Sequence, residues 1–415
     1  MERYSEYKDS GVKWLGEIPS HWEVVRGLAV FSENKNKNTQ LENSIVLSLS
    51  YGKIIVKKDI DSGLVPEEYS SYQIVKPGFI IVRSTDLQND KTSLRIGYVC
   101  NEGIITSAYL GLQVKGNNND KYLYYFLHDW DITKEIYRHG NGLRQSLSWN
   151  DLRDVNVLLP PLSEQDAIVR YIDAATSKID KAIAMQQKMI DLLNERKQII
   201  IQNAVTKGLD DKVEMKESGV EWTEFFPNSW SIKKVKYIFE FISTKEVASN
   251  RTFNIALENI VAHSGNYIDT NSEYEASGVS FRKNDILFGK LRPYLAKVHL
   301  CERAGIALGD IFVLRPLSGF DSSFLRYLLI SEKFIQYVDS STYGAKMPRA
   351  NWDFIGNIYV AYPTLDKQRD ISKYLDKEMQ RFDSAISNCQ RQIALLQERK
   401  QIIINEVVTG KVKVS

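Results

Sequence analysis

Apolar residues recur at helical spacing in two long segments of this sequence. From Ser163 to about Thr206 they follow one another by three, four or seven positions, and the segment contains neither proline nor glycine. This spacing is typical of an amphipathic α-helix and is sustained over about six heptads. The pattern returns between Asp366 and Thr409. We therefore predict two long helices, each about 65 Å in length at ~1.5 Å per residue.

Each predicted helix needs a partner, because its apolar face would otherwise lie in water. The economical partner is the other helix, in a coiled coil. The two-fold logic of a repeated chain favours antiparallel pairing, although parallel pairing is also compatible with the sequence. The residues that we expect on the paired faces are Ile168, Ile172, Ile179, Leu193 and Ile200 in the first helix, and Ile371, Leu375, Phe382, Leu396 and Ile403 in the second.

Both helices have start and stop signals. Ser163 follows the turn Pro160-Pro161-Leu162, and Asp366 follows Pro363-Thr364-Leu365. Ser and Asp are favoured N-cap residues, since their side chains accept hydrogen bonds from free backbone N–H groups. We therefore expect these two residues to cap the helices. A glycine marks each predicted end, at Gly208 and Gly410.

The remaining sequence predicts mixed α/β modules. Short β-branched and aromatic stretches, separated by Gly, Asn, Asp and Ser, are typical of strands. The predicted strands lie at 44–49, 54–56, 79–83 and 98–100 with a helix at 121–137, and again at 253–257, 285–288, 294–300 and 311–314 with a helix at 322–338. The predicted fold class is therefore α+β, with two mixed modules joined by the long helices.

The sequence contains two related copies. Ser10-Gly11-Val12-Lys13-Trp14 returns as Ser218-Gly219-Val220-Glu221-Trp222, and the copies agree again where residues 142–157 parallel residues 344–360. Between these edges they diverge. A repeat of about half the chain is too long for a solenoid and predicts two tandem modules. The predicted boundaries are a first module at 1–160, a helix at 161–208, a second module at 209–362 and a helix at 363–415.

Composition places the chain among globular proteins without naming a function. Lys and Arg total 54 against 52 Asp and Glu, and 43% of the residues are hydrophobic. No run of about 18 apolar residues occurs and the N-terminus lacks a secretory signal, so we expect a soluble, cytoplasmic protein without membrane contact. Cys100, Cys301 and Cys389 are far apart, and we expect neither a disulfide nor a bound metal.

Catalytic signatures are absent from the sequence. It contains no P-loop, GxGxxG, GxSxG, HExxH, NPPY or DPPY motif. Glu195-Arg196-Lys197 and Glu398-Arg399-Lys400 resemble half of a nuclease site, but the upstream acid that such a site needs is missing. A solvated helix face explains them better, since Glu and Lys are strong helix formers. We therefore predict no catalytic residue, and a nuclease is the enzymatic alternative.

Local basic clusters are the remaining candidates for chemistry. Arg and Lys neutralise phosphates, and Arg, Asn and Gln form paired hydrogen bonds with base edges in the major groove. Such clusters are equally common on solvated surfaces, so the pattern alone leaves DNA contact open. The candidate DNA-binding residues are Arg83, Asn89, Lys91, Arg95, Asn141, Arg144 and Gln145 in the first copy, and Lys283, Lys290, Arg292, Tyr294, Lys346 and Arg349 in the second.

Several motifs recur in both copies and together extend over nearly the whole chain. They are residues 7–22 with a partial repeat at 216–230, Pro160 to Gln165 with a repeat at 363–368, and the Leu-Leu-x-Glu-Arg-Lys-Gln-Ile-Ile-Ile helix ends at 192–201 and 395–404. As a set they resemble the specificity subunit of type I restriction-modification systems. Residues 284–295, with Lys-Leu-Arg-Pro-Tyr, also look like a segment of that family's target-recognition domains. The first copy departs from it, having Ile81-Val82-Arg83-Ser84-Thr85 at the equivalent place.

The resemblance implies that DNA recognition and catalysis belong to different subunits. In this family two target-recognition domains each read one half of a split DNA sequence, and the paired helices set the gap between half-sites. The implied partners are double-stranded DNA, two methyltransferase (modification) subunits and motor-nuclease (restriction) subunits. This chain would bind no cofactor, and S-adenosylmethionine, ATP and Mg2+ would belong to the partner subunits. The alternative is a non-enzymatic coiled-coil scaffold or protein-interaction protein.

Overall fold

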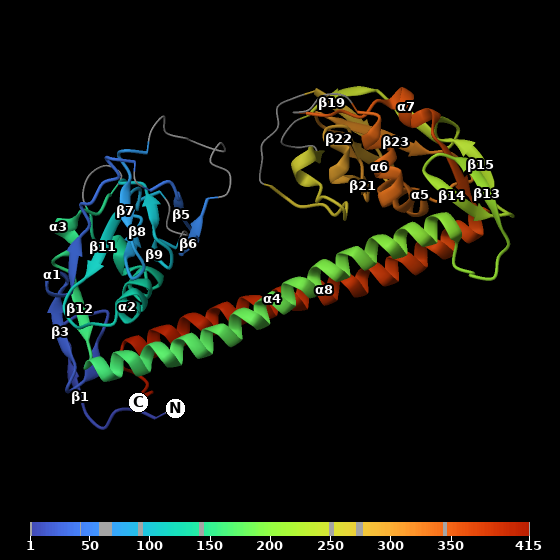
Figure 1. The fold of residues 1–415 in the computed structure, drawn as a ribbon. Coiled ribbons are helices and arrows are strands. Elements are labelled where there is room, and N and C mark those ends of the chain that lie inside the picture. The colour runs from blue at the N-terminus through green and yellow to red at the C-terminus, as the bar shows by residue number, and fades with distance from the viewer. Residues whose placement is uncertain are drawn as a thin grey trace. The chain divides into compact units, whose positions relative to one another are not determined.

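The chain folds into two compact units (Figure 1). The computed structural model describes residues 2–41, 43–57, 69–89, 94–140, 145–248, 253–270, 277–342 and 347–414. Unit 1 comprises residues 1–186 with 391–415, and unit 2 comprises residues 187–390. Each unit contains one mixed α/β module and part of both long helices, α4 (Leu162–Lys207) and α8 (Leu365–Val408). The division into compact units therefore passes through the helices, whereas the predicted boundaries lie at their ends.

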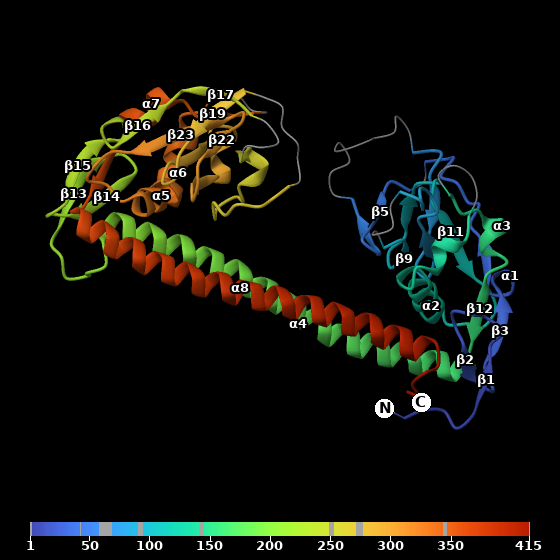
Figure 2. The same cartoon turned by 180° about the vertical axis from the view of Figure 1, so that it is seen from behind.

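The long helices pair in antiparallel fashion within each unit. In unit 1, Ile172 near the start of α4 and Ile403 near the end of α8 belong to the same buried apolar cluster. In unit 2, Ile201 near the end of α4 shares a cluster with Leu375 near the start of α8. Figures 1 and 2 show α4 in green beside α8 in red. Because opposite chain ends meet in each unit, the pairing is antiparallel, and the predicted α+β fold with two paired helices is confirmed.

The predicted helix faces are largely the faces that become buried. In unit 1, Ile168, Ile172, Ile179 and Ile403 are buried and Leu396 packs against them; in unit 2, Ile371 and Leu375 are buried and Ile200 and Phe382 pack against them. Leu193 is only half-buried. The heptad pattern therefore located residues of α4 and α8 that lie in or against the apolar clusters of the two units, and their direct pairing across the helices stays a prediction.

The helix starts differ slightly from the prediction, whereas the ends agree with it. Both helices begin one residue early, at Leu162 and Leu365. The carbonyls of Pro161 and Thr364 accept the first helical hydrogen bonds, so the predicted caps at Ser163 and Asp366 lie inside the first turn. Both final glycines adopt the left-handed conformation that closes a helix, with φ of +79° at Gly208 and +72° at Gly410.

Each module contains an antiparallel sheet of the same strand order. In unit 1 the order is β4 (Phe31–Glu33), β11 (Leu110–Val114), β8 (Ile80–Val82) and β9 (Ile96–Tyr98); in unit 2 it is β16 (Phe239–Ile242), β23 (Ile311–Pro316), β20 (Ile286–Gly289) and β21 (Val298–Leu300). The register is also shared, because Ile80 pairs with Leu112 and Ile286 pairs with Leu314. The two modules are therefore copies of one frame.

The other elements surround this frame. In unit 1 they are β1 (Tyr7–Asp9), β2 (Glu17–Pro19), β3 (Glu23–Arg26), α1 (Gly27–Val30), β5 (Leu47–Ser50), β6 (Lys53–Val56), β7 (Gln73–Val75), β10 (Gly103–Ile105), α2 (Asp120–Ile132), η1 (Glu135–Arg138), α3 (Trp149–Leu152) and β12 (Asn156–Leu159). In unit 2 they are β13 (Met215–Val220), β14 (Thr223–Pro227), β15 (Ser231–Lys234), η2 (Val235–Tyr237), β17 (Lys245–Val247), β18 (Asn254–Ile255), η3 (Leu257–Asn259), β19 (Ser277–Phe281), η4 (Pro293–Leu295), β22 (Gly305–Ala307), α5 (Ser322–Ile330), α6 (Glu332–Ser340), α7 (Trp352–Asn357) and β24 (Tyr359–Tyr362).

Two predicted elements of unit 2 are interrupted. The predicted helix at 322–338 is divided into α5 and α6 at Ser331, whose backbone is extended and whose hydroxyl donates to the carbonyl of Leu328. Of the predicted strand at 294–300, only residues 298–300 form a strand, which is β21. The first half of the predicted strand is the 3-10 turn η4, which begins at Pro293 between left-handed residues Arg292 and Ala296. That turn shapes the candidate site described next.

Candidate nucleic-acid interface

In unit 2, two chain segments lie side by side at the end of the central strand β20. The backbone N–H of Arg292 donates to the carbonyl of Pro348 over 2.8 Å, and that of Ala350 donates to the carbonyl of Lys290 over 2.8 Å. We call residues 290–295 and 347–350 the unit 2 loop pair. The pairing brings Arg349 next to Leu291, across an isolated antiparallel bridge. Residues more than 50 positions apart in the sequence therefore share one surface.

The unit 2 loop pair carries three cationic side chains, and contacts with neighbouring residues orient two of them. Arg292 is exposed, and the guanidinium of Arg349 forms an ion pair with Asp310, with Nη2 and Oδ2 3.0 Å apart. The ammonium of Lys290 lies 4.9 Å from the ring centroid of Phe312, within cation–π range. Such cations can contact phosphates or guanine edges. The surface therefore has the chemistry expected of a DNA contact.

Of the two other candidates in unit 2, Lys283 lies outside the loop pair, whereas Tyr294 belongs to it but lines a separate hollow. Lys283 is exposed but precedes β20, so the strand separates it from the loop pair. Tyr294 lines a hollow of about 640 Å3 together with Asn194 and Gln198 of α4 and residues of α6. Its ring therefore faces the hollow beside the long helix, and its predicted role in DNA contact stays a prediction.

Unit 1 has an equivalent loop pair, formed by residues 83–89 and 145–147. The N–H of Leu147 donates to the carbonyl of Ser84 over 2.8 Å, as Ala350 does to Lys290 in unit 2. Asp86 has a φ of +62°, and Arg292 at the equivalent position has a φ of +52°. The structural match to Lys-Leu-Arg-Pro-Tyr is thus residues 84–88. This match begins three residues after Ile81, where the sequence alone predicts it.

Two polar candidates of the unit 1 loop pair form hydrogen bonds within unit 1. Asn89 is exposed, and its amide donates to Asp86 over 2.7 Å. Gln145 donates its amide to the carbonyls of Tyr137 and His139, which fixes this side chain against η1. Arg83 is half-buried. The candidates Lys91, Asn141 and Arg144 of unit 1 and Lys346 of unit 2 lie outside the described residues.

Arg95 corrects one prediction, because it is fully buried. Its guanidinium donates to the carbonyls of Arg83, Thr85 and Asp86 at 2.8 to 3.2 Å, and it is 0% exposed. A side chain without exposed surface cannot contact DNA in this conformation. Arg95 is instead a positioning residue, which holds the backbone of the loop that follows β8. Sequence alone could not show this, because every residue has a backbone carbonyl and the sequence does not reveal which carbonyls accept from Arg95.

The repeated glutamine of the proline-containing motif fastens each module to a long helix. Gln165 donates to the carbonyl of Pro160 over 2.8 Å and accepts from the N–H of Asn119 over 2.8 Å. In unit 2, Gln368 makes the same two contacts, to Pro363 and Asp321, each at 2.9 Å. Both glutamines are almost fully buried. The motif is therefore structural, and its repetition was the signal that pointed to it.

A second repeated contact joins the module helices to the long helices. The hydroxyl of Tyr125 in α2 donates to Asp173 of α4 over 2.6 Å, and that of Tyr327 in α5 donates to Asp376 of α8 over 2.8 Å. Burial and the carboxylate raise the pKa of the Tyr125 hydroxyl, so it remains a donor. These contacts hold each module firmly on its segment of helix.

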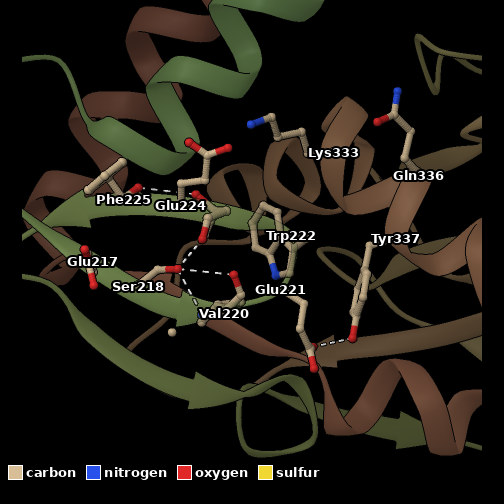
Figure 3. Close-up of a pocket in the computed structure, with 12 residues that line it drawn as sticks. Glu217, Ser218, Val220, Glu221, Trp222, Glu224, Phe225, Lys333, Gln336 and Tyr337 are labelled. Atoms are coloured by element: carbon tan, nitrogen blue, oxygen red, sulfur yellow. Dashed lines mark hydrogen bonds between the residues drawn. The ribbon is translucent and has the colours of Figure 1, made fainter.

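An acidic hollow in unit 2 has different chemistry from the loop pairs. It measures about 770 Å3 and lies beside the hairpin of β13 and β14 in unit 2 (Figure 3). Glu217, Glu221 and Glu224 line it, and Tyr337 donates a hydrogen bond to Glu221. Carboxylates repel phosphates, so this hollow is no part of the candidate DNA surface.

Among the described residues, no group of three or more His, Cys, Asp or Glu side chains is placed to hold a metal ion. Within the same described ranges, no helix has the length and apolar character that crossing a membrane requires.

The chain is similar to several known proteins. Residues 19–189 match the model of the type I restriction modification DNA specificity domain. The specificity subunit of type I restriction enzyme MjaVIII from Methanocaldococcus jannaschii is 22% identical, over 98% of this chain and 97% of its own length. The specificity subunit of type I restriction enzyme EcoDI from Escherichia coli is 21% identical, over 67% of each chain.

The fold has a counterpart among solved structures. A chain from a structure concerning complex assembly and conformational transition of the type I R-M system superposes with a TM-score of 0.69, at 15% identity, over 95% of this chain and 99% of that chain. At this identity the likeness shows a shared fold, in which two modules of one frame are joined by two long helices. Residues 19–189 thus match a type I restriction modification DNA specificity domain, and the chain is similar in sequence to specificity subunits of type I restriction enzymes.

Proposed function

We propose that the two modules read the two halves of a bipartite DNA sequence, each through its loop pair. One observation carries this proposal. Equivalent positions on a shared frame bear different side chains, with Ser84 and Asp86 in unit 1 against Lys290 and Arg292 in unit 2. A common frame would present both loop pairs to a duplex in the same manner. Different side chains would then select different bases.

The chemistry of the loop pairs is suited to direct readout. Arginine forms two hydrogen bonds with the O6 and N7 atoms of guanine, whereas Asp accepts a hydrogen bond from the amino group of cytosine. Arg292 and Asp86 are therefore candidates for base contacts. Lys290 is a candidate for phosphate contact, since a lysine ammonium binds phosphate as a point charge.

We further propose that α4 and α8 set the gap between half-sites and dock the partner subunits. Both helices run unbroken for more than 40 residues. Leu192 and Ile199 of α4 are exposed, and so are their repeat equivalents Leu395 and Ile402 of α8. Exposed apolar residues at helical spacing are typical of protein interfaces. The partners would be two methyltransferase subunits and motor-nuclease subunits, which would carry S-adenosylmethionine, ATP and Mg2+ in the cytoplasm.

The experiment is a selection from a duplex library with a randomised central region, bound by the chain together with its methyltransferase partners. We expect one motif made of two fixed half-sites separated by a fixed gap. Enrichment of no motif would contradict DNA reading and favour the alternative of a protein-interaction scaffold. Binding should also weaken steeply with salt, because phosphate contacts release counterions.

The spacing role has its own test. Deleting seven residues from α4 removes two helical turns but keeps the apolar face in register, since a heptad repeat has that period. The selected motif should retain both half-sites and change only its gap. An unchanged gap would contradict the role of the helices in spacing.

A further inference from the structure

The tip of the β5–β6 hairpin in unit 1 carries an aromatic side chain that the fold does not use. Ser50 pairs with Lys53, so Tyr51 and Gly52 form a two-residue turn between the strands. Tyr51 is 82% exposed. Burying aromatic rings is a main source of folding energy, and this ring contributes little of it. Its exposure therefore calls for a role outside the folded core.

The backbone at Tyr51 is also unfavourable for a tyrosine. Its φ is +44° and that of Gly52 is +76°, as in the hairpin turn that prefers Asn-Gly or Asp-Gly. A bulky residue in the left-handed region is uncommon, because its Cβ crowds the backbone. Strain of this kind is found at functional sites. Asparagine would serve the turn better, so the turn geometry does not explain the tyrosine.

The β5–β6 hairpin packs against β9 and the residues just before it, which include Arg95. A Cβ on Gly52 would lie 3.0 Å from the Cβ of Leu94, and one on Gly97 would meet Leu49 and Ile54 of the hairpin within 3 Å. The tip thus packs directly beside Arg95, whose guanidinium holds the carbonyls of residues 83, 85 and 86. The hairpin tip therefore packs one residue away from Arg95, which holds the loop of residues 83–86.

We propose that Tyr51 is a specificity-determining residue of unit 1, which contacts the base edges or base steps of duplex DNA next to the loop pair. The inference rests on the proposed reading of DNA by unit 1. A tyrosine offers an apolar ring for stacking on a base or on a thymine methyl group, and a hydroxyl for a base edge. Lys53 is exposed beside it and would contact a phosphate.

The test compares Tyr51→Asn with Tyr51→Phe in the complex with the methyltransferase partners, using the same randomised duplex library. Tyr51→Asn removes the ring while suiting the turn, so the thermal stability of the chain should be equal or higher. We expect this variant to lose base preference at one to three adjacent positions of one half-site and to bind the wild-type motif about 10-fold more weakly. Tyr51→Phe should retain most of the preference.

The controls separate this inference from the proposed function. Arg292→Ala should change the other half-site, which assigns the half-sites to units. Tyr359→Asn removes a ring that is 50% exposed on β24 of unit 2 and should leave the motif unchanged. If Tyr51→Asn selects the wild-type motif with wild-type affinity while Arg292→Ala does not, the role of Tyr51 is overturned and DNA reading stands. A wild-type complex that selects no motif overturns both.

Discussion

Lys197 of α4 donates to Asp383 of α8 over 2.5 Å within unit 2. Unit 1 contains the equivalent pair, in which Lys400 of α8 donates to Asp180 of α4 over 2.7 Å. Both lysines belong to the repeated Glu-Arg-Lys motif, so helix pairing explains a motif that resembles half of a nuclease site. The two pairs differ in burial, because the Lys197 side chain is 10% exposed and that of Lys400 is 27% exposed.

This difference predicts unequal costs for removing the two carboxylates. Asp383→Asn should lower the free energy of unfolding by about 1–2 kcal/mol, because it leaves a buried ammonium with a weaker acceptor. Asp180→Asn is the matched control and should cost only about 0.5 kcal/mol, since solvent screens Lys400. Urea unfolding of both variants measures the difference. Equal losses would contradict the argument from burial.

The repeated glutamines should be among the costly polar positions of the chain. Gln165→Leu keeps the size of the side chain but leaves the Pro160 carbonyl and the Asn119 N–H without their amide partner. Unsatisfied buried groups of this kind cost about 1–3 kcal/mol each, so we expect a loss of about 2–4 kcal/mol. Gln368→Leu should cost a similar amount because its contacts are the same. Thermal unfolding would refute this account if either variant matched the wild type.

Arg95 should control the unit 1 loop pair without touching DNA. Arg95→Lys preserves the charge but cannot reach three carbonyls with one ammonium, and we expect a stability loss of about 2–3 kcal/mol. The base preference in the half-site read by unit 1 should become less specific, while the base preference in the other half-site should stay unchanged. Arg83→Ala, at a half-buried position in the same loop, is the comparison. A stable Arg95→Lys variant with an unchanged selected motif would show that the loop needs no such support.

The sequence predicted the long helices well because their periodicity reports directly on the buried face. It could not predict the roles of Arg95 or Tyr51, which depend on neighbours that are distant in the chain. Arg95 bonds to backbone carbonyls, which every residue possesses. Gly52 is a turn signal between two apolar runs, yet only the packing of Gly52 against Leu94 places this turn next to Arg95. The break at Ser331 was missed for a similar reason, since serine is tolerated within helices.

Asp129 predicts a dependence of stability on pH. It is buried in α2, where both carboxylate oxygens accept from Asn405 of α8 at 3.0 Å, and burial raises its pKa from 3.8 to about 6. A raised pKa in the folded chain means that its contribution to stability falls as the pH rises from about 4 to 6.

Asp129→Asn removes this dependence while keeping an acceptor for Asn405. At pH 7.5 the variant should be more stable than the wild type by about 2 kcal/mol, because no buried carboxylate must ionise. At pH 4 the two proteins should be nearly equal, since protonated Asp resembles Asn. Urea unfolding across this range gives the difference curve. A constant difference from pH 4 to 7.5 would mean that the titration of Asp129 is not its cause.

Arg292 and Lys283 are exposed cations on either side of β20, and they separate a role in base reading from general attraction to DNA. Arg292→Ala should weaken binding to the selected motif by about 10- to 100-fold and relax the preference at one or two base pairs. Lys283→Ala removes the same charge away from the loop pair, so it should alter binding less than about 3-fold and leave the preference intact. Fluorescence anisotropy on the selected motif and on single-base variants of it measures both. If the two substitutions weaken binding equally for every sequence, net charge and not the unit 2 loop pair governs the contact, and the loop pair is excluded as the reading surface.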